Sequence, residues 1–246
     1  MHVSEFGPSD GPPVLLLHGG GVAGWMWTSL RRTLEATYKV VVPDLPGHGH
    51  SADEPYQSHT ETANALSQLL VRGGSNPTAV IGFSLGAQLT IELASQYPEL
   101  VDRVMIVSAQ AKAMPFAGLT LRALGAAAPL AQNRRFARLQ ARELFVPAEL
   151  MEEYIDTSAH ITKTTLLAAV GDNMRFAVPP TWSEFHGQAF VMVGSRERAL
   201  MRDSAKIIHA ALPSSDMEIV PGRGHGIPLE CPDWFNPRVA AWLALQ

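Results

Sequence analysis

Residues 78–86 read Thr-Ala-Val-Ile-Gly-Phe-Ser-Leu-Gly, an apolar run that leads into a serine flanked by two glycines. A buried strand that turns sharply into a helix at a serine lifts that hydroxyl above the edge of a sheet. A Cβ at Gly82 or Gly86 would crowd so tight a turn. The stretch therefore predicts a strand–turn–helix unit with Ser84 as a candidate nucleophile. The plainer alternative is a turn in which Ser84 only caps the helix.

The composition indicates one large domain with a substantial core. The chain has 246 residues, of which 46% are hydrophobic and 17% are charged, so disorder is not expected. A formal net charge of -4 gives no reason to expect nucleic acid or an anionic membrane as a partner. With 1 Cys, Cys231, the chain can form no internal disulfide and suggests no metal site or cofactor.

The chain shows no targeting signal. Its first residues lack the basic start and the apolar stretch of a signal peptide. No run of about 18 apolar residues is present, so no transmembrane helix is expected. We therefore expect a cytoplasmic protein, and the oligomeric state is left open.

Strand-like and helix-like segments alternate along most of the chain. Several strand-like segments are continuous apolar runs, which indicates burial on both faces and hence a parallel sheet covered by helices. The expected strands are residues 14–18, 39–44, 78–83, 103–108, 188–194 and 216–220. The expected helices of this part are residues 27–36, 60–71, 85–97, 203–212 and 234–245.

Residues 111–186 break the alternation, because no good strand occurs among them. Their pattern predicts short helices at residues 115–127, 133–143, 147–158 and 163–173. The stretch leaves the sheet at the carboxyl end of a strand, where ligands bind in open parallel sheets. We interpret it as a helical lid over Ser84, with a helical insertion around its own small core as the alternative. The core domain is then residues 1–110 and 187–246.

A nucleophilic serine needs a base, an acid that orients the base, and donors for the oxyanion. The candidate base is His225, because glycines on both sides let its loop curl toward another element. The candidate acid is Glu197, the first carboxylate after the strand at residues 188–194. Asp203 is the second choice, and a solvated role for Glu197 between two arginines is the plain alternative.

The oxyanion donors are expected to be backbone N–H groups. One is that of Leu85, which follows Ser84 at a helix N-terminus, where the helix dipole also favours negative charge. The other is expected from the Gly-rich loop after the first strong strand, with Gly20 as the first choice and Gly21 as the second. His18, which opens this loop, is interpreted as a structural residue.

These motifs, in this order, resemble the α/β-hydrolase fold superfamily. The resemblance spans nearly the whole chain outside the lid and implies a mostly parallel sheet of about seven strands, with residues 3–6 as an edge strand. The order nucleophile, acid, histidine is the one that this fold uses. The chain departs from the family at Glu197, where an Asp is usual. The motifs that carry the resemblance are residues 18–21, 44–51, 82–86, 194–197 and 224–225.

The resemblance also limits the chemistry. Relatives that open epoxides or remove halides use an Asp at the position of Ser84, so the serine implies acyl chemistry. The expected reaction is hydrolysis of a small-molecule acyl substrate through a Ser84–His225–Glu197 triad. The bond is an ester, lactone, thioester or amide, or a C–C bond next to a carbonyl. A receptor-like binding protein with little turnover and an acyltransferase are the alternatives.

The substrate pocket is expected to be apolar, with no ring of positive charge near the motifs to favour highly anionic substrates. Tryptophans after the Gly-rich loop would line one side of it or would simply pack, and aromatic residues of the lid would line the other. The pocket candidates are Gly21, Trp25, Trp27, Phe116, Phe136 and Phe145.

Overall fold

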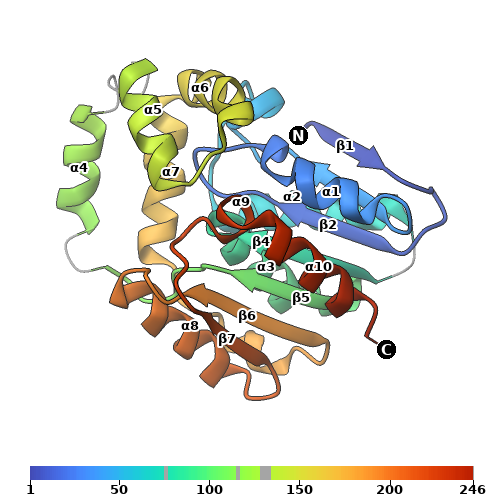
Figure 1. Cartoon of the computed structure of the whole chain (residues 1–246). Helices are drawn as coiled ribbons and strands as arrows, with labels where there is room; N and C mark the ends of the chain where they lie inside the picture. The colour runs from blue at the N-terminus through green and yellow to red at the C-terminus, as the bar shows by residue number, and fades with distance from the viewer. Residues whose placement is uncertain (75–76, 115–116, 128–133, 246) are drawn as a thin grey trace.

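The computed structural model describes residues 1–74, 77–114, 117–127 and 134–245. Within these residues, the strands form one 7-stranded sheet in the order β1-β3-β2-β4-β5-β6-β7 (Figure 1). β1 runs antiparallel to β3, and the other neighbouring strands pair in parallel. The strands are β1 (Val3–Phe6), β2 (Pro13–Leu17), β3 (Lys39–Pro43), β4 (Thr78–Phe83), β5 (Val101–Val107), β6 (Gln188–Gly194) and β7 (Asp216–Val220).

The sheet is buried on both faces, which explains the continuous apolar runs in its strands. Along β2, Leu15 and Leu17 pack in the cluster that includes the buried residues of α2, α3 and α8. Val14 and Leu16 point the other way, into the cluster that includes α1 and α10. These helices are α1 (Thr28–Leu34), α2 (His59–Gly73), α3 (Leu85–Gln96), α8 (Ala199–Ala211) and α10 (Pro232–Leu243).

The fold confirms the predicted α/β-hydrolase architecture, including the edge strand at residues 3–6. Most differences are at element ends. The helix expected at residues 27–36 is a 3-10 turn, η1 (Gly24–Trp27), followed by α1. The helix expected at residues 203–212 is α8, which begins at Ala199, so Asp203 lies inside this helix and not at its start. Two further short helices are η2 (Gly49–Ser51) and α9 (Ile227–Glu230).

Between residues 111 and 186, the described part of the chain is helical and holds no strand. In Figure 1 the described α-helices of this stretch gather beside one end of the sheet, and α4 packs on α7 and α5 on α6. They are α4 (Ala117–Ala127), α5 (Arg134–Glu143), α6 (Met151–His160) and α7 (Lys163–Arg175). Three short 3-10 helices lie near them: η3 (Pro98–Leu100) before β5, η5 (Ala148–Leu150) before α6, and η6 (Pro180–Glu184) after α7. Their role as a lid stays a prediction. None of the helices in the described ranges is long and apolar enough to cross a bilayer.

Candidate active site

Ser84 stands on a strained turn between β4 and α3. Its backbone has φ 54 and ψ -110, outside the regions that residues with a side chain prefer. A Cβ at Gly86 would collide with the carbonyl oxygens of Leu17 and His18, so the turn requires glycine there. The Ser84 side chain makes no capping hydrogen bond to α3, which argues against the N-cap alternative.

His225 lies directly beside Ser84. Its Nε2 atom is 3.1 Å from the Ser84 hydroxyl oxygen, and its Nδ1 atom is 2.8 Å from Oε2 of Glu197. The imidazole remains 31% exposed, while its ring leans on Phe83, the last residue of β4, with ring centroids 5.1 Å apart. The ring thus bridges a hydroxyl and a carboxylate while one side stays open to incoming molecules.

Glu197 is buried although the arginines on both sides of it are exposed. Its side chain is 1% accessible, so it is not the solvated glutamate of the alternative interpretation. The second carboxylate oxygen, Oε1, accepts hydrogen bonds from the Ser108 hydroxyl at 2.7 Å and from the backbone N–H of Gly194 at 2.9 Å. Asp203 lies elsewhere, because its carboxylate is 46% exposed and faces Lys112 Nζ at 3.7 Å.

Ser108 is a residue of this site that the sequence did not single out. It follows β5, is fully buried and has φ 57, an unusual backbone conformation for a serine. Its own N–H donates to the carbonyl of Met192 in β6, which ties the turn to the strand that precedes Glu197. The feature of the sequence that could have identified Ser108 is its position at the carboxyl end of a strand, next to the strand that precedes the acid.

The Gly-rich loop lies against the start of α3. A Cβ built on Gly20 would be 3.8 Å from the Leu85 side chain, which places the loop beside Leu85. Gly21 has φ +81, a conformation that favours glycine, and open space lies where its side chain would be. The two predicted donors, Gly20 and Leu85, therefore border the same space above Ser84.

His18 fixes the base of this loop. Its Nδ1–H donates to the Gly19 carbonyl at 2.8 Å, and its Nε2 accepts the N–H of Leu45 at 2.9 Å. Burial, with a smaller contribution from His48, lowers its pKa from 6.5 to about 3. A neutral His18 with its proton on Nδ1 satisfies both contacts, which fits the structural role expected for it.

A cavity of about 630 Å³ opens above Ser84. Its floor comes from Gly20, Gly21, Ser84, Leu85 and His225, and its other walls come mainly from α4–α7. Among the described residues that line it, there is no Lys, Arg, Asp or Glu. The remaining lining residues are His48, Thr120, Leu124, Gln140, Leu144, Tyr154, Ser158, Ile161, Leu166, Ala169, Val170 and Asn173.

Three of the aromatic pocket candidates, Trp25, Trp27 and Phe145, are not among the described residues that line this cavity. Trp25 and Trp27 line a separate cavity of about 400 Å³, and Trp27 stacks on Phe235 in the core. Phe145 is 40% exposed and lies over the His225 loop, close to Gly224. Phe116 lies outside the described residues, and so does the side chain of Phe136.

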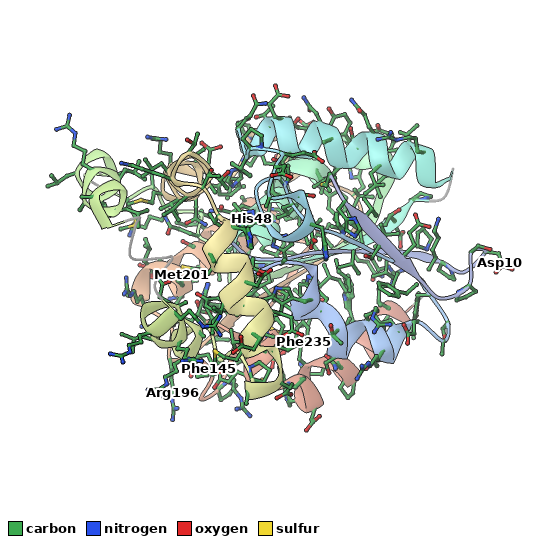
Figure 2. The ribbon with its side chains drawn as sticks, turned by 90° about the horizontal axis from the view of Figure 1, so that it is seen from above. Asp10, His48, Phe145, Arg196, Met201 and Phe235 are labelled. Atoms are coloured by element: carbon green, nitrogen blue, oxygen red, sulfur yellow. The ribbon has the colours of Figure 1, made fainter. Side chains whose placement is uncertain are left out.

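His48 is a second cavity residue that the sequence did not single out, although it stands inside the motif at residues 44–51. It is buried, with 2% of its surface exposed, and its ring meets that of His18 edge-on with centroids 5.3 Å apart. Its Nδ1–H donates to the Pro46 carbonyl at 3.0 Å. Burial lowers its pKa, so the ring is held neutral. In Figure 2, His48 lies toward the interior whereas Arg196 projects outward.

No group of three or more His, Cys, Asp and Glu side chains among the described residues is arranged to hold a metal ion. The site itself joins one hydroxyl, one imidazole and one carboxylate in hydrogen-bond contact. Such a chain of groups can move a proton from the hydroxyl to the imidazole while the carboxylate balances the imidazolium charge.

Comparison with known sequences places six of the seven described strands and the site in one family, because the sequence profile of the "Alpha/beta hydrolase family" matches residues 14–238. The chain belongs to the alpha/beta hydrolase family. It is accordingly a hydrolase. The profile match runs from β2 into α10 and so includes Ser84, Glu197 and His225.

Individual relatives agree with the family assignment. An uncharacterized protein of Mycobacterium tuberculosis is 27% identical over 253 residues, covering 88% of this chain and 70% of the relative. A pimeloyl-[acyl-carrier protein] methyl ester esterase of Vibrio campbellii is 32% identical over 112 residues, which is 46% of this chain and 42% of the esterase. The solved structure of an esterase from Exiguobacterium antarcticum has a TM-score of 0.85 at 18% identity, with coverage of 99% and 95%, and so shares the fold of this hydrolase.

Proposed function

We propose that this hydrolase cleaves carboxylic esters or closely related acyl compounds with Ser84 as nucleophile, His225 as base and Glu197 as the orienting acid. The observation that carries the proposal is the unbroken hydrogen-bond chain from the Ser84 hydroxyl through His225 to the buried Glu197 carboxylate. The esterase name of a 32% identical relative supports the acyl substrate class.

The reaction would proceed in two halves. Ser84 Oγ attacks the substrate carbonyl as its proton passes to Nε2 of His225, and Glu197 stabilises the resulting imidazolium. The carbonyl oxygen becomes an oxyanion held by the N–H groups of Leu85 and Gly20. His225 then gives the proton to the leaving alcohol, and the acyl group stays on Ser84. Water then attacks this acyl-enzyme as its proton passes to His225, and His225 returns the proton to Ser84 Oγ as the bond to the acyl group breaks and the acid leaves.

The cavity supports an uncharged substrate that is largely apolar near the reacting carbonyl. Leu85 and Leu144 flank the Ser84 and His225 region of its lining, and α7 contributes Leu166 and Val170. In the absence of a described charged residue in the lining, a phosphate or carboxylate on the substrate would find no counter-ion. We also propose that α4–α7 act as the lid of this cavity, since they supply most of its walls.

Hydrolysis of p-nitrophenyl acetate, butyrate and hexanoate by the purified chain tests the proposal. Steady turnover is expected, and Ser84→Ala should abolish it without unfolding the protein. Ser95→Ala, on the helix that follows Ser84, is the matched control, because the buried hydroxyl of Ser95 has no hydrogen-bond partner among the described residues. Turnover that survives Ser84→Ala, or a single burst without steady turnover in the parent protein, would contradict the proposal.

A further inference from the structure

The wall of the cavity formed by α7 carries a side-chain amide whose orientation is fixed from behind. Asn173 lines the cavity, and its Nδ2 donates to Oε1 of Gln88 at 3.1 Å. Gln88 is fully buried on α3, four residues after Ser84, which is about one helical turn, or 5.4 Å. Asn173 and Ser84 therefore line the same cavity.

The amide of Gln88 can adopt only one orientation. Its Nε2 lies 2.7 Å from the carbonyl oxygen of Gln110 and 3.2 Å from that of Asn173. Carbonyl oxygens only accept hydrogen bonds, so the nitrogen of Gln88 must face them and its Oε1 must face the other way. Nε2 of His59 also lies 2.8 Å from this oxygen and must therefore carry a proton. Gln88 Oε1 thus accepts from two donors.

The orientation of Asn173 follows from that of Gln88. Because Gln88 Oε1 is an acceptor, the Asn173 atom that faces it must be the nitrogen. The other end of the Asn173 amide, Oδ1, has no hydrogen-bond partner among the described residues, while the side chain lines the cavity. Asn173 Oδ1 is therefore a hydrogen-bond acceptor with a fixed orientation at this wall of the cavity.

His48 presents a second acceptor to the same cavity. Its Nδ1 must carry the proton, because it faces the carbonyl oxygen of Pro46 at 3.0 Å. A neutral ring protonated on Nδ1 leaves Nε2 as an acceptor, and Nε2 forms no hydrogen bond with another described residue. The contacts of Asn173 and those of His48 therefore indicate independently that the cavity holds hydrogen-bond acceptors without a partner among the described residues.

We infer that the substrate of this site carries at least one hydrogen-bond donor, a hydroxyl or an amide N–H, that lies away from the scissile carbonyl and is bound by Asn173 Oδ1. The substrate class is thus an uncharged hydroxylated or amide-bearing ester and not a plain alkyl ester. This inference rests on the proposed function, since it names a substrate feature of the same site. Asn173 would act as a specificity-determining residue.

A matched set of esters tests the inference on the unmodified protein. The acyl-side set is p-nitrophenyl octanoate with hydrogen, hydroxyl or methoxy at carbon 6, 7 or 8. The alcohol-side set is the monoacetates of hexane-, heptane- and octanediol with their methyl ethers. One gained hydrogen bond predicts a kcat/KM about 5- to 10-fold higher for the hydroxyl than for the methoxy compound in one of the sets. The methoxy group matters because it accepts hydrogen bonds but cannot donate one.

Two variants connect the preference to its residue. Asn173→Leu should reduce the hydroxyl-to-methoxy ratio to about 1, because leucine offers no acceptor. Asn64→Leu, which makes the same change on α2 at a residue outside the cavity lining, should keep the ratio of the parent protein. The ratio compares two substrates on one protein sample, so it is insensitive to partial unfolding of a variant.

The outcomes of these assays distinguish the proposed ester hydrolysis from the inferred hydrogen-bond donor on the substrate. No turnover of any ester in either set would overturn the proposed function and this inference with it. Turnover of hydroxyl and methoxy compounds at equal kcat/KM in both sets would overturn only the inference about the donor. A preference for the hydroxyl that persists in Asn173→Leu would overturn the assignment to Asn173.

Discussion

Nδ1 of His225 lies 2.8 Å from Oε2 of Glu197, a carboxylate whose other oxygen is held by Ser108 and by the backbone of Gly194. Both oxygens of this buried acid thus have partners, which fixes the plane of the carboxylate against the imidazole. A glutamate can take the position where an aspartate is usual in the family because two further groups hold its longer side chain.

Glu197→Gln should lower kcat for ester hydrolysis by roughly three to four orders of magnitude. The amide cannot stabilise the imidazolium, and its NH₂ end could hold His225 in the wrong tautomer. Steady-state kinetics on a p-nitrophenyl ester measures the effect. Asp203→Asn, at the alternative acid in α8, should stay within about twofold of the parent rate, and the reverse ranking of the two variants would reassign the acid.

Ser108→Ala should lower kcat by about tenfold or more, because it leaves a buried carboxylate oxygen with one fewer donor. The role of Ser108 is positioning, so KM should change less than kcat. Ser204→Ala is a matched control, since the Ser204 hydroxyl is also buried but its one partner among the described residues is the Leu200 carbonyl of its own helix. Equal kcat values for the two variants would show that Ser108 does not support Glu197.

Gly86→Ala should lower the free energy of unfolding by about 3 kcal/mol or more, because the added methyl group meets the carbonyl oxygens of Leu17 and His18. Urea denaturation gives the value. Gly73→Ala, at the end of α2 with no atom within 4 Å of the new methyl group, should leave stability unchanged or raise it by up to about 1 kcal/mol. Similar effects at both positions would refute the crowding argument for the turn.

Stability should fall as the pH drops below about 6.5, in part because of His18. Burial lowers the pKa of folded His18 from 6.5 to about 3, so between these values the unfolded chain binds a proton that the folded chain does not. One such group adds a slope of up to about 1.4 kcal/mol per pH unit, with stability rising as pH rises. The contribution is complete above the unfolded pKa.

Urea denaturation between pH 4 and pH 7 checks this slope in His18→Asn, which keeps a side-chain donor and acceptor but cannot titrate. The slope should be shallower in this variant than in the parent protein. The exposed His186 provides the control, and His186→Asn should keep the parent slope. A parent-like slope in His18→Asn would show that His18 does not carry the effect.

Local sequence was enough to predict the fold and the position of Ser84. The strands are apolar runs with clear ends, and the glycines at positions 82 and 86 are required by contacts only a few residues away or across one strand. Glu197 and His225 could then be chosen because each follows a strand, and parallel strands bring those ends to one edge.

The parts that were missed depend on contacts between distant segments. Ser108 and Glu197 are 89 residues apart, and Gln88 and Asn173 are 85 residues apart. Nothing near Trp25 in the sequence shows that its indole turns to Thr157, 132 residues away, and not to the cavity. The register of the strands and the orientation of the helices determine such contacts, and neither can be derived from a single sequence.

Labelling with a fluorophosphonate, followed by mass mapping of the modified peptide, tests the central assignment most directly. The reagent forms a stable adduct only with a serine that is activated as a nucleophile. We predict one adduct at Ser84 in the folded protein, greatly slowed in His225→Ala and absent after unfolding in urea. No adduct at Ser84 in the folded protein, or an adduct on another serine, would contradict the account of this site.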